Sequence, residues 1–245
     1  MRERCWKLEA RECPYCGRKL KPLHAVLMGR DAFMGWEECS CPGAAKERMD
    51  AEASEKEKRE KELERSIDER LIFSGVGKRF IGIDYGDAAK LARAMEDGRN
   101  VYISGPVGTG KTSCAAAVAR ELIQDGKSAR FVRMTDVLDS VRRSWKTGEK
   151  ALGHLERVPF LFLDDLGKEQ PTGFALECIF SLIDERYANL RPVCITTQYS
   201  PSELSSRLSQ TGDPDTAAAV VSRLMQQCTR VMFGGKDRRI ADNPS

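Results

Sequence analysis

The sequence predicts an α/β fold with a parallel sheet, and three observations lead to this prediction. From residue 71 onward, apolar runs of strand length alternate with longer segments of helical pattern, as in parallel α/β sheets. A glycine-rich loop, residues 105–112, separates one apolar run from an Ala-rich helical segment. The preceding residues are different: 1–43 are rich in Cys, Gly and Pro, and 44–70 are densely charged. We therefore expect a cysteine-rich module (1–43), a linker helix (44–70) and an α/β domain (71–245).

Length and composition limit the possible functions. A chain of 245 residues is long enough for one well-packed domain with a small appended module. The net charge is only +3, so any contact with nucleic acid must come from a local basic patch. No apolar run reaches the length of a membrane span, and the first ten residues lack the apolar core of a secretory signal. We expect a cytoplasmic protein with no membrane partner.

The expected elements of the α/β domain follow from these patterns. Strands are expected at 101–104, 129–133, 159–163, 193–197 and, less clearly marked, 231–233. Helices are expected at 112–124, 135–147, 173–189, 201–208 and 216–228.

The charged run 44–70 contains no Pro or Gly and consists largely of good helix formers. Oppositely charged pairs such as Glu57/Lys61 lie four residues apart, which favours a helix. Its apolar residues are too sparse for a coiled-coil seam. We interpret the run as a solvated spacer helix; the alternative is a helix that docks on a partner.

The glycine-rich loop carries the strongest functional signal. GPVGTGKT (105–112) matches the pattern G-x-x-x-x-G-K-[ST] completely. Glycines let the backbone curl so that its N–H groups face phosphate oxygens, and the following helix adds its positive N-terminal end. Lys111 is expected to reach the β- and γ-phosphates, and Thr112 to offer its hydroxyl to Mg²⁺. The expected ATP-binding residues here are Gly105, Pro106, Gly108, Thr109, Gly110, Lys111, Thr112 and Ser113.

An acidic pair and an amide complete the expected site. Residues 160–163 form an apolar run that ends in Asp164 and Asp165, about 50 residues after the loop. Two acids after a strand are often only a turn or a helix cap. In this context we expect Asp164 to lie beside Mg²⁺ and Asp165 to act as the general base on water. Gln198, at the end of the run 193–197, is the candidate sensor of the γ-phosphate.

With these motifs in this order, the chain resembles the AAA+ helicase loaders and the related transposase-helper ATPases. The resemblance covers roughly residues 71–240. Leu166-Gly167 after the aspartate pair and Arg186-Tyr187 before a strand are its more specific features. The residues that carry it are GPVGTGKT (105–112), FLFLDDLGKEQPT (160–172), ERYANLRPVCITTQYSPSEL (185–204) and VVSRLMQQC (220–228). It implies an AAA+ P-loop NTPase fold for this domain.

The resemblance also implies roles for two C-terminal segments. Ser222-Arg223-Leu224 looks like the family's arginine-finger motif, in which the arginine reaches a neighbouring subunit's γ-phosphate. This implies self-association through Arg223; the alternative is an arginine on the solvent face of a helix. The segment ending in Arg239 resembles the family's second sensor motif, with Arg238 a possible substitute. Gln198 stands where the family usually has Asn.

The cysteines of the N-terminal module have metal-ligand spacing. Cys13-Pro-Tyr-Cys16-Gly resembles a zinc knuckle, while Cys39-Ser-Cys41 is a tighter and weaker signal. We predict a structural Zn²⁺ held by these four thiolates, which would supply stability to a module with little apolar sequence. Cys5 and His24 are spare candidates. A redox role is less favoured because no βαβ pattern surrounds the cysteines.

The resemblance implies an ATP-dependent loader that places a replicative helicase on single-stranded DNA during the initiation of DNA replication. Its ATPase activity would be weak alone and stimulated by the partner or by DNA. Loader relatives carry N-terminal modules that contact the helicase, so residues 1–43 are expected to bind this partner. A zinc ribbon contacting DNA through Trp36 and the basic stretch 18–21 is the alternative.

The sequence also allows alternative interpretations of DNA contacts and of function. Arg142, Arg143, Trp145 and Lys146 suit contacts with single-stranded DNA, or form an ordinary solvated helix face. A transposase helper that remodels duplex DNA, or a nucleotide-binding adaptor with little turnover, would share the same ATP site.

Overall fold

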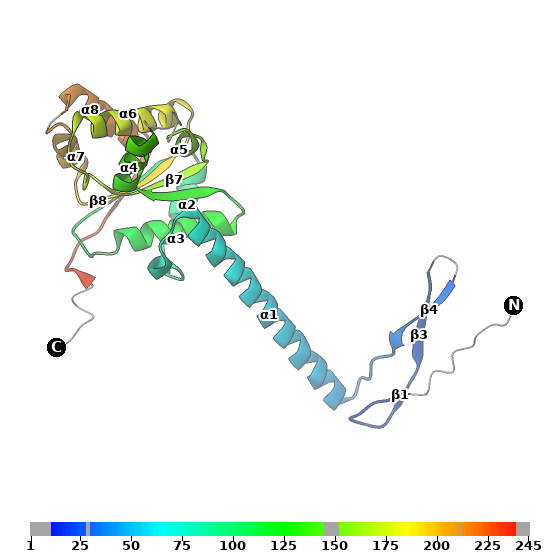
Figure 1. The fold of residues 1–245 in the computed structure, drawn as a ribbon. Helices are drawn as coiled ribbons and strands as arrows, with labels where there is room; N and C mark the ends of the chain where they lie inside the picture. Colours follow the sequence, from blue (N-terminus) through cyan, green and yellow to red (C-terminus); the bar gives the residue numbers. More distant parts are fainter. Residues whose placement is uncertain (1–10, 28–29, 145–151, 211, 239–245) are drawn as a thin grey trace. The chain divides into compact units, whose positions relative to one another are not determined.

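A computed structural model describes residues 11–27, 30–144, 152–210 and 212–238 of the 245-residue chain. The chain divides into two compact units, Met1–Glu64 and Arg65–Ser245 (Figure 1). Helix α1, Pro42–Ser74, contributes residues to both. In the described part of the chain, no helix combines the length and apolar character needed to cross a membrane.

The first unit contains two small antiparallel sheets. Strand β1 (Arg11–Glu12) pairs with β2 (Lys19–Leu20), and β3 (Pro22–Leu27) pairs with β4 (Arg30–Trp36). These strands were not predicted from the sequence, because they lack a regular alternation of apolar and polar residues. The buried cluster here consists of Cys13, Cys39 and Ala44, which is too little apolar surface to stabilise a fold alone.

Helix α1 confirms that the charged run is helical, and it extends beyond the predicted 44–70 at both ends. Residues 49–66 are all exposed, and Lys61 pairs with Glu57 (2.6 Å between Nζ and Oε1). The last turns differ, because Ile67 and Leu71 are buried in the core of the second unit. The end of α1 is therefore part of the second unit rather than a free spacer.

The second unit is built on a five-stranded parallel sheet, as the sequence predicted. The strand order is β6-β7-β8-β5-β9. The strands are β5 (Asn100–Ser104), β6 (Ala129–Arg133), β7 (Phe160–Leu166), β8 (Val193–Thr197) and β9 (Cys228–Met232). The helical elements are η1 (Lys78–Phe80), α2 (Ala88–Glu96), α3 (Lys111–Gln124), α4 (Met134–Ser144), α5 (Gly153–Arg157), α6 (Gly173–Ala188), α7 (Pro201–Leu208) and α8 (Pro214–Met225).

Both faces of the sheet are covered by helices. Successive residues of β5 enter different cores: Val101 and Ile103 pack with α2, α3 and the end of α1, whereas Tyr102 packs with α4–α8. This alternation follows from the two-residue period of a strand. Figure 1 shows the same arrangement, with α3 on one side of the sheet and α4, α6 and α8 on the other. The loops after the strands therefore meet at one edge of the sheet.

Both predicted ends of one helix need correction. The helix expected at 216–228 begins at Pro214, because Asp213 caps it by accepting a hydrogen bond from the Thr216 amide (2.8 Å). It ends at Met225, and Gln227 has a positive φ of 49°, so Cys228 belongs to β9 and not to the helix. Helix α2 was not predicted. The end of the helix expected at 135–147 lies outside the described residues beyond Ser144.

Arg186, part of the motif that carried the resemblance, is completely buried. Its guanidinium donates hydrogen bonds to the carbonyls of Leu155 (2.6 Å), Val158 (2.8 Å) and Pro192 (2.8 Å). Burial lowers its pKa to about 9. This side chain joins the loops that precede β7 and β8, the strands whose ends carry the acidic pair and Gln198.

Candidate functional site

The glycine-rich loop connects β5 to α3. Gly105, Gly108 and Gly110 have φ angles of 142°, 73° and 104°, which residues with a Cβ rarely adopt. A side chain at Gly105 would also collide with the carbonyl of Phe233. The loop therefore requires glycine at these positions. Its curled backbone leads directly into the N-terminus of α3, an arrangement that suits phosphate.

Lys111 and Thr112, the first residues of α3, lie where the motif predicts. Lys111 is largely buried, and its Nζ donates to the Pro106 carbonyl (2.7 Å), so its side chain lies along the loop. The Thr112 hydroxyl donates to Oδ1 of Asp164 (2.9 Å). This contact joins the glycine-rich loop to the end of β7.

Asp164 is buried below the loop. Its Oδ1 accepts hydrogen bonds from Thr112 and from Thr196 (2.6 Å). Burial raises the pKa of Asp164, and the hydrogen bonds from the two threonines oppose this effect. A carboxylate and a hydroxyl in contact are hard oxygen ligands of the kind that Mg²⁺ prefers. The donor set therefore fits the predicted Mg²⁺ position.

Asp165 lines a cavity that lies over the glycine-rich loop and is described below. Its φ is 60°, and its backbone N–H donates to the Thr196 hydroxyl (2.9 Å), which holds this uncommon conformation. Its Oδ2 forms an ion pair with Nζ of Lys168 (2.8 Å). The two adjacent aspartates thus have different surroundings: one is buried beside the two threonines, and the other borders open space.

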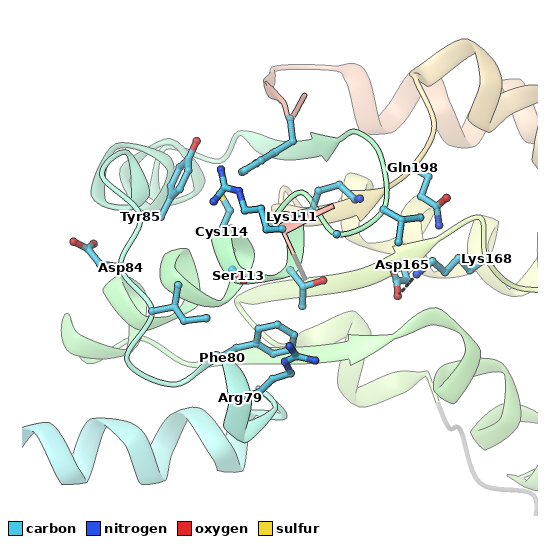
Figure 2. A pocket seen from close by; sticks show the side chains of 17 residues that line it. Arg79, Phe80, Asp84, Tyr85, Lys111, Ser113, Cys114, Asp165, Lys168 and Gln198 are labelled. Atoms are coloured by element: carbon cyan, nitrogen blue, oxygen red, sulfur yellow. Dashed lines mark ion pairs between the residues drawn. The ribbon is translucent and has the colours of Figure 1, made fainter. Parts of the chain in front are cut away.

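A cavity of about 480 Å³ lies over the loop (Figure 2). It brings together most of the residues that the sequence singled out. Those that line it are Gly108, Gly110, Lys111, Thr112, Ser113, Asp165, Gln198 and Arg238. Asp164 contacts Thr112 from below, and Gly105, Pro106 and Thr109 belong to the same loop. Arg239 lies outside the described residues.

The opposite wall of this cavity was not predicted from the sequence. It consists of the segment before α2 and the end of the sheet, with the Tyr85 and Phe233 rings 5.8 Å apart. The lining residues that the sequence did not single out are Arg79, Phe80, Ile83, Asp84, Tyr85, Cys114 and Phe233; Val107 and Lys168 also line the cavity and lie within the motifs quoted above. No local pattern marks this wall, because residues about 150 positions apart meet only through the sheet order.

Arg223, the predicted finger, does not line this cavity. It lies on α8, where its Nε forms an ion pair with Oδ1 of Asp184 on α6 (2.8 Å). Its guanidinium lies 4.9 Å from the ring centre of Phe180 and 5.7 Å from that of Tyr187. These contacts hold the arginine against α6, at a distance from its own chain's cavity.

The four predicted cysteines of the first unit form one cluster. Their Sγ atoms all lie within 4.8 Å of one another, with 3.7 Å between Cys13 and Cys41 and 3.5 Å between Cys16 and Cys39. Sulfur atoms around a tetrahedral Zn²⁺ lie about 3.8 Å apart. The cluster therefore has the dimensions of a four-thiolate metal site.

Local hydrogen bonds shape this cluster. The Gly17 amide donates to the Cys13 carbonyl (2.9 Å), and Gly17 has a positive φ of 70°, as a knuckle turn requires. Cys41 precedes α1 and accepts from the Ala44 amide (3.4 Å). Of the spare candidates, His24 lies on β3 against Phe33 and outside the cluster, and Cys5 lies outside the described residues.

Comparison with known proteins agrees with this geometry. The chain is 25% identical to the replicative helicase loader DnaI of Bacillus subtilis, over 94% of this chain and 79% of that protein. It is 30% identical to an insertion sequence ATP-binding protein of Sinorhizobium fredii, over 60% of this chain and 58% of that protein. The crystal structure of the DnaC helicase loader superposes with a TM-score of 0.55 and 25% identity, covering 64% of this chain and 100% of that one.

The fold similarity confirms the predicted AAA+ P-loop architecture of the second unit. A family model described as IstB-like ATP binding protein matches residues 74–243, a range that contains the glycine-rich loop, the acidic pair and Gln198. The chain therefore belongs to the IstB-like ATP-binding protein family.

Proposed function

We propose that the protein is an ATPase that loads a replicative helicase onto single-stranded DNA. One observation favours helicase loading over a transposase-helper function. The similarity to DnaI extends over 94% of the chain and so reaches well into the cysteine-bearing unit. The similarity to the insertion sequence protein covers only 60% of the chain. A relative that shares both units is the better guide to what the combination does.

The arrangement of the cavity supports ATP hydrolysis. The curled loop and Lys111 would hold the β- and γ-phosphates, and the apolar wall around Phe80, Tyr85 and Phe233 would take the base. Thr112 and Asp164 would hold Mg²⁺, which offsets charge that develops on the phosphates. Asp165 would accept a proton from the attacking water, and Gln198 and Arg238, which also line the cavity, would contact the phosphates. The bond between the γ-phosphorus and the β–γ bridging oxygen then breaks, releasing ADP and phosphate.

Arg223 would complete this site from a second subunit. Since it lies against α6 and outside its own cavity, it can act on phosphate only if another chain presents its cavity to α8. A guanidinium there would offset negative charge on the phosphoryl group in the transition state. We therefore propose self-association in which each subunit supplies Arg223 to its neighbour.

The cysteine-bearing unit would be the helicase-binding part. We propose that residues 1–43 form a zinc module, that 44–70 connect it to the ATPase domain, and that 71–245 form that domain. Single-stranded DNA would be a second partner of the ATPase domain. Cytoplasmic location follows from this role, since replicative helicases act on chromosomal or phage DNA inside the cell.

Purified protein is expected to contain about one Zn²⁺ per chain, bound by the four thiolates. Cys13→Ser should lose most of this zinc, because it removes one of four ligands and the unit has little apolar core to compensate. Cys228→Ser, in β9, is the control and should retain full zinc. Metal content measured by mass spectrometry checks the prediction, and equal zinc in the Cys13→Ser protein would contradict it.

The loader function is tested with a replicative helicase from the same source. Wild-type protein with ATP is expected to bind the helicase and transfer it to circular single-stranded DNA. Cys13→Ser should lose helicase binding while ATP binding persists, because under this proposal the two functions would lie in different units. Helicase transfer that is unaffected by Lys111→Ala would show that turnover is dispensable, as in an adaptor.

A transposase-helper function is the second candidate, and the similarity to the insertion sequence protein favours it. It predicts a preference for duplex DNA and ATP-dependent filaments, with no helicase binding. Measuring duplex and single-stranded DNA binding in parallel separates the two functions.

A further inference from the structure

Lys168 forms an ion pair that the proposed chemistry does not use. Its Nζ lies 2.8 Å from Oδ2 of Asp165, the candidate general base. Both side chains line the nucleotide cavity together with Lys111 and Gln198, and Figure 2 shows the pair at the same end of the cavity as Gln198. A second lysine is thus placed at the phosphate end, outside the glycine-rich loop.

The backbone around Lys168 is held on both sides. The Gly167 amide donates to both carboxylate oxygens of the buried Glu169 (3.1 and 3.0 Å). Arg207 of α7 donates from Nε to the Gly167 carbonyl (3.1 Å) and from a terminal guanidinium nitrogen to the Glu169 carbonyl (3.1 Å). These hydrogen bonds fix the backbone on both sides of Lys168. The position of its Cα relative to the cavity is therefore fixed, and only its long side chain can move.

The ion pair affects how Asp165 can act. With Nζ on Oδ2, one of the two carboxylate oxygens of Asp165 is already in a charged hydrogen bond, so only the other oxygen is left for a water molecule to approach. The two side chains are 41% and 28% exposed, and ion pairs at such exposure contribute little to stability. A more highly charged anion placed nearby can therefore take Lys168 away from Asp165.

We propose that Lys168 binds the γ-phosphate of ATP and thereby releases Asp165 to act on water. Nζ exchanges one anionic oxygen, Oδ2, for another on the γ-phosphate, a movement within the reach of a flexible four-carbon stem. ADP has no γ-phosphate, so the ion pair persists and the base stays occupied. Lys168 would thus distinguish ATP from ADP. This inference rests on the proposed ATPase function.

The experiment compares Lys168→Met with Lys127→Met. Lys127 is a matched control, because it is 47% exposed and pairs with Glu96 (3.3 Å), but it does not line the cavity. Affinities are measured for ADP and for a non-hydrolysable ATP analogue that retains the γ-phosphate. Lys168→Met is expected to weaken binding of the analogue about tenfold, as loss of one charged hydrogen bond predicts. ADP binding should be unchanged, and Lys127→Met should match wild type with both nucleotides.

Turnover supplies a second readout. Lys168→Met should raise the KM for ATP and lower kcat, because the γ-phosphate loses a cation, and Lys168→Arg should retain part of both. An equal loss of ADP and analogue affinity, or no loss of either, would overturn the inference. A higher kcat with unchanged analogue affinity would also overturn it, since Lys168 would then only restrain Asp165. Failure of the wild-type protein to bind or hydrolyse ATP would instead refute the proposed function itself.

Discussion

Replacing Asp165 by Asn is expected to lower ATP turnover by about 10²–10⁴-fold, the range of a lost general base. An amide keeps the shape of the carboxylate but cannot accept the proton of the attacking water. ATP affinity should not fall, because Asp164, Thr112 and the glycine-rich loop stay in place. Steady-state phosphate release and equilibrium binding of the non-hydrolysable ATP analogue measure the two effects separately.

Asp125→Asn is the control for this change. Asp125 is an exposed acid at the C-terminal end of α3, and it does not line the nucleotide cavity. It should turn over ATP like wild type. Wild-type turnover in the Asp165→Asn protein would show that another group activates the water. Loss of ATP binding together with turnover would show that Asp165 contributes to holding the substrate.

Arg223→Ala is expected to reduce turnover by about 10³-fold or more, the effect of a missing arginine finger. Its ATP affinity should stay near that of wild type, because Arg223 does not line its own cavity. The substitution leaves Asp184 without its ion-pair partner at a partly exposed position, where the cost to stability is small. Turnover and thermal unfolding of the same preparation distinguish a catalytic loss from a folding defect.

Mixing the Arg223→Ala and Lys111→Ala proteins tests whether the site is shared. Each variant alone should be nearly inactive. In a mixed assembly, a Lys111→Ala subunit can supply its intact Arg223 to the intact nucleotide site of an Arg223→Ala neighbour, so part of the activity should return. If subunits co-assemble and no activity returns, the finger does not act between subunits.

Local chemistry explains why so much of the ATP site was predictable. The glycine-rich loop depends on backbone angles that only glycine adopts easily. The glycines that it needs therefore appear as a short local pattern in the sequence. The strands that flank the site are short apolar runs, and all five expected strands lie within three residues of their predicted bounds. The Asp164–Asp165 pair was predictable because it directly follows the apolar run 160–163, which forms most of β7.

Other elements depend on signals that local patterns do not contain. The end of α8 is set by the backbone at Gln227 and by the pairing of β9 with β5, so a helical pattern alone overextended the helix to Cys228. The described side chains of strands β1 to β4 form no buried face that would impose alternation, and the sequence of these strands carried no strand signal.

The sequence alone determined the parallel α/β architecture, the phosphate loop, the acidic pair and the four cysteines, because each depends on neighbouring residues. Tertiary structure decided which distant side chains meet. The order β6-β7-β8-β5-β9 places the ends of β5, β7 and β8 side by side, so Asp164 contacts both Thr112 and Thr196. It also decided that Arg223 lies against α6, where it pairs with Asp184. Those contacts depend on the separation of side chains in space, which spacing along the chain does not specify.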